Sequence, residues 1–362
     1  MRVAIRADAS VTLGSGHVAR CLVLARALRA RGASVTFLGQ ALPGSMEDEI
    51  RRQGFSSVVL PAGVPADEDA ARCKAALAED VDLLVVDHYG LDAVWERAMR
   101  SRAQVLLAID DLADRTHECD VLLDQNLAAD PEGRYRGKLP GHCRCLLEPR
   151  HALLGEEFVR LAPQAALRTG ALRRILIFFG GGDPDGLTGR ALAELDAVDP
   201  ALAGDVVIGA ANPRREALAA LCAASGGRWR LHVQTGHMAE LMAAADLALG
   251  AGGFSHWERC AMALPALVVT VADNQVAATR ILHERGACQW LGDAATLQGA
   301  PFAQAVRALR AAPEALRAMS RAAHEIVPEG GGVARVLAAL AQLPPLAALD
   351  SPSDDIDGRI PR

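Results

Sequence analysis

The stretch Arg6-Ala-Asp-Ala-Ser-Val-Thr-Leu-Gly-Ser-Gly-His-Val-Ala-Arg-Cys-Leu22 carries the clearest signal for fold and function in this chain. The apolar residues 3–5 lead into a turn with Gly14 and Gly16, and an amphipathic helix follows. Glycine lets a backbone approach a ligand closely, and the N–H groups of a first helical turn attract anions. His17 lies on that turn, where a helix N-terminus disfavours the imidazolium form. We therefore expect a phosphate-handling turn with a neutral histidine that acts as a general base; the alternative is a histidine that only packs against the sheet.

Short apolar runs alternate with helical patterns from the first residue, which is typical of parallel strands joined by crossover helices. In the first half the expected strands cover residues 3–5, 34–38, 58–60, 83–86, 105–109, 121–123 and 145–147. In the second half they cover residues 175–179, 206–208, 230–233, 247–249 and 267–271. A helix is predicted over 17–31 and stops at Gly32, and helices over about 302–325 and 331–343 close the series.

Both halves open with an apolar strand, a glycine turn and a helix. The sequence therefore predicts an α/β protein with two Rossmann-like domains in tandem and a cleft between them. Residues 1–160 are expected to form the first domain and residues 174–345 the second, joined by a linker over 161–173 that is rich in Ala, Arg and Gly. The stretch 350–362 is polar, contains two prolines and lacks periodicity, and we expect a disordered tail over residues 346–362.

The composition excludes several classes of protein. A chain of 362 residues suits two domains of ordinary size. The net charge is −6 with both signs interspersed, which argues against nucleic-acid binding. No apolar run approaches the roughly 20 residues that span a bilayer, and residues 1–7 fit a strand better than a signal peptide. The cysteines include no CxxC pair and the histidines show no HxxxH or HxH spacing, so we expect buried reduced thiols, a cytoplasmic location and no metal site.

Two glycine turns in the second half each follow an apolar strand and precede a helix. The first, Gly180-Gly181-Gly182-Asp183-Pro184, predicts a backbone cradle for a diphosphate, with the helix that begins near Thr188 aimed at it. The second, Gly250-Ala-Gly252-Gly253-Phe-Ser255-His-Trp-Glu258, has Ser255 at an N-cap position and Glu258 three residues later. Glu258 is therefore either half of a capping box or a carboxylate that accepts hydrogen bonds from ribose hydroxyls, and both interpretations stay open.

Polar residues also follow two buried strands, at the strand ends where such sheets bind ligands. Asp87-His88-Tyr89-Gly90 follow the strand at 83–86, and Asp273-Asn274-Gln275 follow the strand at 267–271. We expect both groups to face a ligand. The alternatives are a surface turn that carries a histidine and a simple cap for the helix that begins near Val276.

In this order, the motifs resemble the UDP-sugar hydrolases of pseudaminic acid biosynthesis (the PseG type) and the related SpsG-like polysaccharide biosynthesis proteins. Met238-Ala-Glu-Leu-Met-Ala-Ala-Ala-Asp246 and Trp257-Glu258-Arg259-Cys260 add to the match, which extends over residues 1–330. The resemblance implies a GT-B fold, shared with MurG, and hydrolysis of UDP-2,4-diacetamido-2,4,6-trideoxy-β-L-altropyranose to UDP and the free sugar. It also implies a cytoplasmic monomer whose partner is a small UDP-sugar, with no cofactor, no metal, no nucleic acid and no stable membrane association.

The same resemblance implies roles for individual residues, with His17 as the catalytic residue. The residues expected to line the sugar are Asp8, Gly14, Gly16, His88, Tyr89 and Asn274. The residues expected to hold UDP are Gly181, Gly182, Asp183, Gly252, Gly253, Ser255, Glu258 and Gln275.

Three other functions use similar sequence features. An inverting glycosyltransferase shares the fold and the UDP site but adds an acceptor surface, and no basic or apolar patch for one is obvious. A UDP-sugar 2-epimerase requires carboxylates that move a proton at C2, for which Asp8 or Asp87 would serve. A nucleotide-sugar-binding subunit without catalysis is the alternative from a different class, and His17 argues against it.

Overall fold

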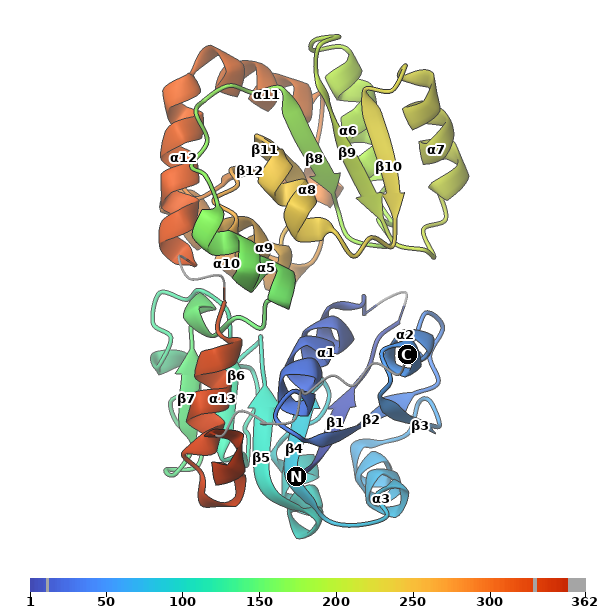
Figure 1. Ribbon diagram of the computed structural model, residues 1–362, viewed down its shortest axis with the longest axis vertical. Coiled ribbons are helices and arrows are strands. Elements are labelled where there is room, and N and C mark those ends of the chain that lie inside the picture. Colours follow the sequence, from blue (N-terminus) through green and yellow to red (C-terminus); the bar gives the residue numbers. More distant parts are fainter. Residues whose placement is uncertain (11–12, 328–330, 351–362) are drawn as a thin grey trace, which may run out of the picture. The chain divides into compact units, whose positions relative to one another are not determined.

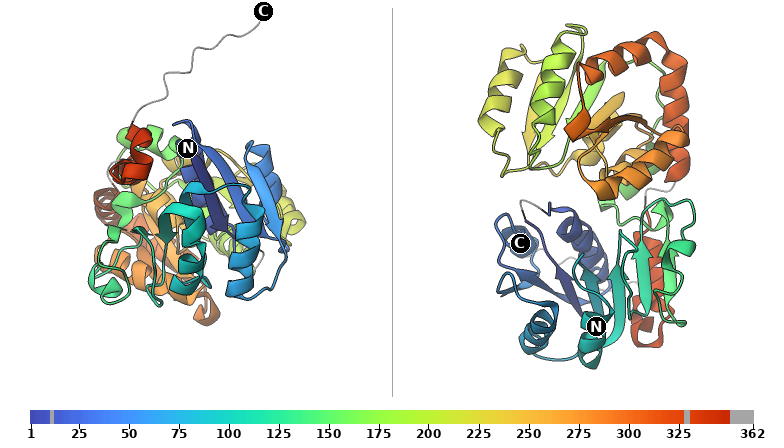
Figure 2. Two further views of the ribbon diagram at one scale, coloured as in Figure 1. Left: turned by 90° about the horizontal axis from the view of Figure 1, so that it is seen from below. Right: turned by 180° about the vertical axis from the view of Figure 1, so that it is seen from behind.

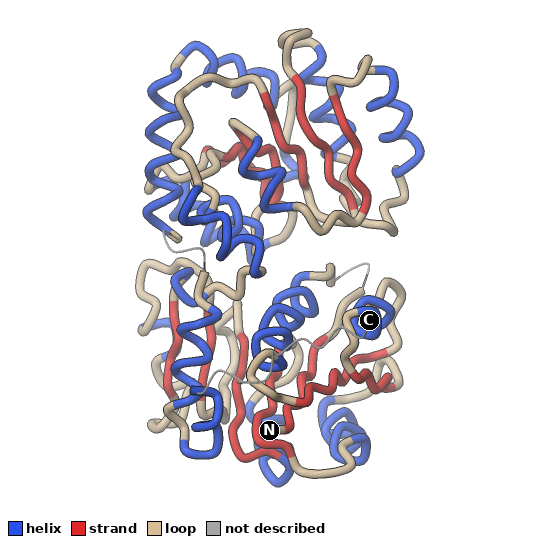
Figure 3. The backbone as a smooth tube through the Cα atoms, in the orientation of Figure 1, coloured by secondary structure: helices blue, strands red, loops and turns tan. Residues whose placement is uncertain are grey.

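The computed structural model describes residues 1–10, 13–327 and 331–350, and the chain divides into two compact units. Unit 1 comprises Met1–Gln125, Asp130–Leu153 and the chain from Gly332 onward, and unit 2 comprises Asn126–Ala129 and Leu154–Gly331. Each unit is built on one parallel β-sheet with helices packed on it (Figures 1 and 3). The predicted alternation of strands and helices is therefore confirmed, and each unit is Rossmann-like.

In unit 1 the carboxyl ends of strands β1 and β4 lie side by side in the centre of the sheet. Its strands are β1 (Arg2–Ala7), β2 (Ser34–Gln40), β3 (Ser56–Leu60), β4 (Val81–Asp87), β5 (Ala103–Ile109), β6 (Val121–Asp124) and β7 (Arg144–Leu147). Its helices are α1 (Gly16–Arg29), α2 (Glu47–Arg52), α3 (Ala66–Ala76), α4 (Ala93–Met99) and α13 (Val333–Ala341). The strands lie in the order β3-β2-β1-β4-β5-β6-β7 and are all parallel. Successive strands are added on one side of β1 up to β3 and on its other side from β4 onward, so the switch point lies between β1 and β4. Ala7 pairs there with Asp87, and such a switch point is where open parallel sheets bind ligands.

Alternate strand residues of unit 1 face two different layers of helices, because successive side chains of a strand point to opposite sides. Ile5 and Val85 belong to the core that also contains buried residues of α1 and α13. Ala4 and Leu84 belong to the core that contains buried residues of α3 and α4. The sheet is therefore covered on both faces, which leaves the carboxyl ends of its strands as the place for polar side chains.

Unit 2 repeats this arrangement with a second sheet. Its strands are β8 (Arg174–Phe178), β9 (Ala203–Ile208), β10 (Trp229–Val233), β11 (Leu247–Ala251), β12 (Ala266–Thr270) and β13 (Gln289–Asp293). Its helices are α5 (Glu156–Leu161), α6 (Leu187–Asp196), α7 (Arg215–Ala224), α8 (Met238–Ala244), α9 (Ser255–Ala261), α10 (Val276–Glu284), α11 (Pro301–Ala311) and α12 (Pro313–Ile326). The order is β10-β9-β8-β11-β12-β13, so the switch point lies between β8 and β11. The glycine turns at Gly180 and Gly252 follow these two strands, and both turns therefore begin at that point.

Two local predictions in unit 2 differ from the structure. The edge strand β13 was not predicted, because its residues are only half-buried or exposed and form no apolar run. The single helix predicted over residues 302–325 is two helices, α11 and α12, which meet at Pro313. Proline lacks an N–H group and its ring clashes with the preceding turn, so it starts a new helix there.

The C-terminal helix α13 belongs to unit 1, whereas the prediction placed residues 331–343 in the second domain. Leu337 and Leu340 are buried in the core of unit 1, and Figures 1 and 2 show α13 beside the elements of that unit. The prediction of a disordered tail from residue 346 is also wrong in its first part. Leu346 and Leu349 are buried in the same core, within a 3₁₀ helix over Pro344–Asp350. Residues 351–362 lie outside the described residues.

The segment 161–173, predicted to be a linker, packs within unit 2. The buried guanidinium of Arg168 donates hydrogen bonds to the carbonyl oxygens of Met242 (2.7 Å) and Ala245 (2.9 Å), where α8 ends. It also donates to the carbonyl oxygen of Met262 (3.1 Å), where α9 ends. The last carbonyls of a helix lack partners within the helix. Arg168 therefore caps two helices, and burial lowers the pKa of this arginine to about 10.

Leu340→Ala is expected to destabilise unit 1 by about 2–5 kcal/mol, because it leaves a cavity in a close-packed core. Hydrogen exchange followed by mass spectrometry should show faster exchange in β1 and β5, with β8 and β11 unchanged. Leu221→Ala is the control, since Leu221 is 47% exposed on α7 and should change neither unit. Loss of protection confined to unit 2 would contradict the assignment of α13.

Candidate functional site

The site in unit 1 is organised by an ion pair at the end of β4. Arg20 of α1 donates two hydrogen bonds of 2.6 Å to the carboxylate of Asp87, one from Nε and one from Nη2. Its Nη1 donates to Asp111, which follows β5, at 2.9 Å. Arg20 and Asp87 are both buried, with side chains 6% and 1% exposed. Helix α1 is thus tied to the carboxyl ends of two neighbouring strands.

Both members of this ion pair stay charged. Burial alone would raise the pKa of Asp87, but the positive charge of Arg20 and the hydrogen bonds that Arg20 donates outweigh it, so the pKa of Asp87 is lowered. Burial likewise opposes the charge on Arg20, but Asp111 and Asp87 raise the pKa of this arginine well above its ordinary value. One guanidinium between two carboxylates leaves this corner of the sheet negative.

His17 lies one helical turn before Arg20 and is held mainly by ring packing. Its imidazole is edge-on to the ring of Tyr89, with the ring centroids 4.4 Å apart and an interplanar angle of 81°. The hydroxyl of Tyr89 donates to Asp111 Oδ2 at 3.5 Å. His17 is 7% exposed, and no hydrogen bond to either of its ring nitrogens is found among the described residues. The geometry fixes the ring and leaves its nitrogens available.

The turn that leads into α1 exposes its glycines. Gly14 has a φ of +78°, a left-handed conformation that favours glycine, and it pairs with Ser10 across the turn. Ser15 precedes α1 and forms no side-chain cap, so the first N–H groups of the helix carry no side-chain acceptor. A Cβ at Gly14 or Gly16 would meet nothing within 4 Å, so these glycines face open space. Residues 11 and 12 lie outside the described part of the turn.

Asp8 is held by buried partners. Arg6 Nη1 lies 2.7 Å from Asp8 Oδ1, and the main-chain N–H of Gln40 donates to the same oxygen at 2.7 Å. His88 Nε2 lies 3.3 Å from Asp8 Oδ2. Burial raises the pKa of Asp8, but the hydrogen bonds with His88 and Arg6 have the larger, opposite effect. The pKa of Asp8 is therefore well below its usual range. Asp8 and His88, both predicted to line the sugar, therefore lie in contact with each other.

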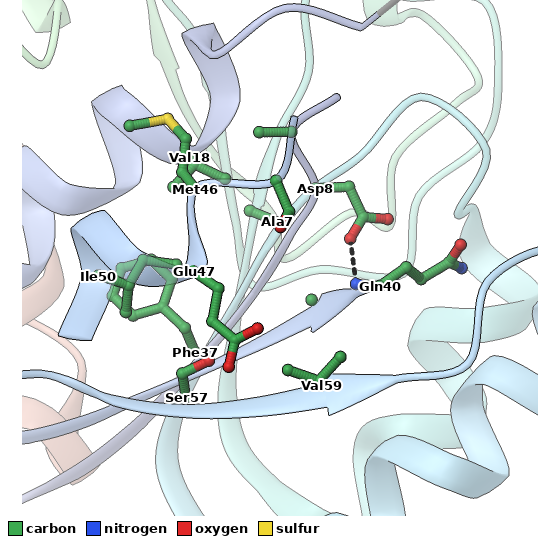
Figure 4. Close-up of a pocket in the computed structure, with 13 residues that line it drawn as sticks. Ala7, Asp8, Val18, Phe37, Gln40, Met46, Glu47, Ile50, Ser57 and Val59 are labelled. Carbon is green, nitrogen blue, oxygen red and sulfur yellow. Dashed lines mark hydrogen bonds between the residues drawn. The ribbon is translucent and has the colours of Figure 1, made fainter. Parts of the chain in front are cut away.

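A small pocket lies beside this group, at the ends of β1 and β2 and against α2 (Figure 4). Asp8 and Gln40 contribute polar atoms to its wall, and Val18 of α1 contributes an apolar one. His17 and Tyr89 do not line it. The pocket therefore lies near His17, because Val18, the next residue of α1, lines it.

The first glycine turn of unit 2 differs from its predicted form at Asp183. The carboxylate of Asp183 accepts hydrogen bonds of 2.9 Å from the main-chain N–H groups of Leu187 and Thr188, the first residues of α6. The sequence predicts that the N-terminus of this helix binds a phosphate, but the carboxylate of Asp183 already caps it. At this turn the candidate donors for a phosphate are therefore the main-chain N–H groups of Gly181 and Gly182. Asp183 itself has a φ of +43° and is buried.

The second glycine turn differs from a capping box. Helix α9 begins at Ser255, so Phe254 occupies the N-cap position and no side chain caps the helix. Ser255 instead hydrogen-bonds to Glu258 within the helix. Burial raises the pKa of Glu258 to about 7, although Arg259 and Ser255 act in the opposite direction. A half-buried carboxyl that titrates near neutral pH is typical of a functional site.

Gln275 supports this second turn from the side. A Cβ at Gly252 would lie 2.9 Å from Cβ of Gln275, so only glycine fits there. The side-chain oxygen of Gln275 accepts a hydrogen bond from Val271 N–H at 3.0 Å, and Asn274 precedes it on an exposed 3₁₀ turn over Asp273–Gln275. The predicted UDP residues Gly252 and Gln275 are thus brought together. Asn274, predicted to touch the sugar, belongs to unit 2, whereas the other residues predicted to line the sugar belong to unit 1.

Two groups of residues were missed by the sequence interpretation. Asp87 is the last residue of β4, and Asp111 is the second residue after the neighbouring strand β5. The signal for Asp111 was the pair of carboxylates, Asp110 and Asp111, at the end of a buried strand. The second group consists of two buried arginines, Arg20 of α1 and Arg259 of α9. Their position among apolar helical residues was the sequence signal that could have revealed them. A charge within an apolar helical face indicates a specific partner, because an unpaired charge is costly to bury.

The cysteines and candidate metal ligands complete the inventory. All eight cysteines are free; Cys145 is exposed and Cys143 half-buried, which corrects the expectation that every thiol is buried. Over residues 1–10, 13–327 and 331–350, no group of three or more His, Cys, Asp or Glu side chains is arranged to hold a metal ion. Across the same described ranges, none of the helices is both long and apolar enough to cross a bilayer.

The chain has the GT-B fold. A crystal structure of MurG from Acinetobacter baumannii matches it with a TM-score of 0.65 and 17% identity, over 94% of this chain and 99% of that one. In sequence, the chain is 26% identical to the spore coat polysaccharide biosynthesis protein SpsG of Bacillus subtilis over 296 residues, 81% of this chain and 84% of that protein. It is 29% identical to the UDP-2,4-diacetamido-2,4,6-trideoxy-β-L-altropyranose hydrolase of Campylobacter jejuni over 164 residues, 45% of this chain and 56% of the hydrolase. No model of a known protein family matches the chain.

The loop that carries Asp111 is anchored by a buried histidine. His117 Nδ1 lies 2.7 Å from Glu96 Oε1, and its Nε2 lies 3.6 Å from Asp110 Oδ2. Burial lowers the pKa of His117, but the two carboxylates outweigh it and raise this pKa to about 9. The imidazolium therefore stabilises the folded protein fully below the ordinary pKa of about 6.5, and this contribution is lost as the pH rises through about 9.

His117→Gln is expected to reduce the loss of stability between pH 6 and pH 9.5 by about 3 kcal/mol, because glutamine carries no proton to lose. Urea unfolding at both pH values measures the difference. His142→Gln is the control, since the side chain of His142 is 58% exposed. An unchanged pH dependence in His117→Gln would show that the imidazolium does not hold this loop.

Proposed function

We propose that this protein is a UDP-sugar-acting enzyme that hydrolyses UDP-2,4-diacetamido-2,4,6-trideoxy-β-L-altropyranose, or a closely similar UDP-sugar, to UDP and the free sugar, as in pseudaminic acid biosynthesis. The observation that carries the proposal is the placement of His17, whose ring packs on Tyr89 at the switch point of unit 1 and forms no hydrogen bond that is found among the described residues. The similarity to the Campylobacter hydrolase supports the choice of substrate class.

In the proposed reaction, a water oxygen forms a bond to the anomeric carbon. The bond from that carbon to the diphosphate oxygen breaks, and its electron pair leaves with UDP. A ring nitrogen of His17 takes the proton from the attacking water, which requires the neutral imidazole. Direct displacement inverts the anomeric carbon. UDP is a good leaving group, so the reaction needs no separate general acid.

The proposed nucleotide site uses the two glycine turns of unit 2. The main-chain N–H groups of Gly181 and Gly182 at one turn, and of Gly253 at the other, would stabilise the charge that develops on the diphosphate. Asp183 would act by shaping its turn, since its carboxylate caps α6. Glu258 would accept hydrogen bonds from the ribose hydroxyls, with Ser255 bonded to it and Gln275 supporting the turn.

The proposed sugar site uses the residues around His17. Tyr89 would pack against the sugar as it packs against the imidazole, and His88 would contact the sugar while Asp8 orients its ring. Gly14 and Gly16 face open space and would let the sugar approach the backbone. The role assigned to Asn274 rests on the sequence resemblance.

An inverting glycosyltransferase is the second candidate, because MurG shares the fold. It would use the same nucleotide turns but release UDP only when an acceptor is present. A 2-epimerase is disfavoured by the chemistry of its candidate carboxylates. Asp8 and Asp87 are both held in buried ion pairs with lowered pKa values, whereas a proton shuttle works best near neutral pH.

His17→Ala is expected to lower the turnover of UDP-sugar hydrolysis by about 10² to 10⁴, the usual loss when a general base is removed. UDP binding should stay nearly unchanged, because the nucleotide is assigned to unit 2. NMR detection of UDP and free sugar measures the turnover, and calorimetry measures UDP binding. His142→Ala is the matched control, and near wild-type turnover in His17→Ala would remove His17 from the mechanism.

Uridine affinity is expected to fall by about fivefold as the pH is lowered from 8 to 6, because a carboxylate binds hydroxyls more strongly than a neutral carboxyl does. The midpoint should lie near the Glu258 pKa of about 7. Uridine is the probe because its phosphate-free structure does not titrate in this range. The dependence should vanish in Glu258→Gln and persist in Glu216→Gln, which changes an exposed carboxylate of α7. A pH-dependent Glu258→Gln variant would rule out this role.

A further inference from the structure

The most unusual charged group of unit 2 is Arg259, which lies beneath the second glycine turn. The residue is 3% exposed. Its Nη2 donates to the carbonyl oxygen of Ala251 at 2.9 Å and to His256 Nδ1 at 3.0 Å. A Cβ at Gly250 would lie 2.7 Å from Nη1, so the guanidinium is pressed against the end of β11. It therefore occupies the space between that strand and the first turn of α9.

Arg259 has no anionic partner in the part of the chain that the structure describes. No carboxylate lies within ion-pair distance of it, and its Nε is buried without a hydrogen-bond partner. The other buried arginines differ. Arg6 and Arg20 pair with aspartates, and Arg168 is surrounded by carbonyl oxygens. Burial lowers the pKa of Arg259 below its ordinary value, and the weaker effect of Glu258 in the opposite direction does not offset it.

The neighbours of Arg259 do not neutralise its charge. His256 accepts from Arg259 at Nδ1 and lies 2.9 Å from the hydroxyl of Thr279 at Nε2, so the ring is neutral with its proton on Nε2. Burial and the charge of Arg259 keep the pKa of His256 well below its ordinary value. Cys260 and Cys288 are protonated thiols, because burial raises their pKa values to about 12. Glu258 is adjacent in sequence, but it is half protonated near neutral pH.

The turn above this charge presents unused donors. Gly253 has a φ of +87°, and within the described residues the main-chain N–H groups of Gly253 and Phe254 donate no hydrogen bond. A buried positive charge under such donors raises the local potential without contacting solvent, so it favours an anion at the turn. The unpartnered Nε shows that the protein alone does not satisfy this arginine.

We infer that Arg259 is a positioning residue that gives the β11–α9 turn its preference for the diphosphate of UDP, acting through the backbone rather than by direct contact. The inference rests on the proposed function. It separates two parts of nucleotide recognition, because the charge stabilises the diphosphate while Glu258 and the turn itself hold the nucleoside. His256 and Thr279 complete the arrangement by keeping the guanidinium against the turn, and Gly250 leaves room for it.

The test compares the affinities for UDP and uridine, which share the nucleoside and differ in the diphosphate. Arg259→Met should weaken UDP binding on the order of tenfold more than uridine binding, because only the diphosphate interacts with the charge directly. The higher pKa of Glu258 that follows loss of the charge affects both ligands alike. Arg259→Gln is the second variant, since its amide keeps a hydrogen bond to Ala251 without the charge. Arg259→Lys should restore part of the UDP affinity. Arg285→Met is the control for net charge, since Arg285 is exposed at the end of α10.

Calorimetry on the full chain measures the affinities for UDP and uridine, and thermal melting shows whether each variant is folded. Equal losses of UDP and uridine affinity in Arg259→Gln would show a structural role only and overturn the inference. Unchanged UDP affinity in a folded Arg259→Gln would overturn it as well. A wild-type protein that binds neither ligand would instead contradict the proposed function.

Discussion

The ion pair between Arg20 and Asp87 is the interaction on which the candidate catalytic corner depends. It ties α1 to the end of β4, and through Nη1 it also holds Asp111 after β5. Tyr89 bonds to Asp111, and His17 packs on Tyr89 one turn of helix before Arg20. Removing one partner would leave a buried, unpaired charge, which costs about 3–5 kcal/mol. The orientation of the imidazole therefore depends on the buried Arg20–Asp87 pair, which holds Asp111 and, through Asp111, the ring of Tyr89.

The two units differ in whether their buried charged side chains near the candidate site are paired. In unit 1 the buried carboxylates Asp8 and Asp87 are paired with arginines and stay ionised, so the region around His17 is not an anion site. In unit 2 the buried cation Arg259 has no carboxylate partner among the described residues, and the glycine turns leave N–H donors unused. This division suits a substrate with a diphosphate at one end and a neutral sugar at the other. Water activation and charge stabilisation are then assigned to different units of one chain.

The sequence allowed the repeated α/β pattern to be predicted because strand and helix periodicities are local. It also located the polar residues at the strand ends, since a switch point collects them wherever a parallel sheet changes direction. Contacts between distant segments were out of reach. Nothing near Leu340 indicates that α13 returns to unit 1, and nothing near Arg168 indicates that its segment packs within unit 2. At Asp183 the sequence interpretation assigned the N-terminus of the following helix to a phosphate, but the carboxylate that lies nearest in sequence occupies it.

Hydrolysis in water enriched in oxygen-18 tests the central claim most directly, because it identifies which bond breaks and whether water is the acceptor. Incubation of the protein with the UDP-sugar and mass spectrometry of both products should find one heavy oxygen in the free sugar and none in UDP. Label in UDP would mean attack at phosphorus and would contradict the role assigned to His17. Release of UDP only after an acceptor is added would identify a transferase instead.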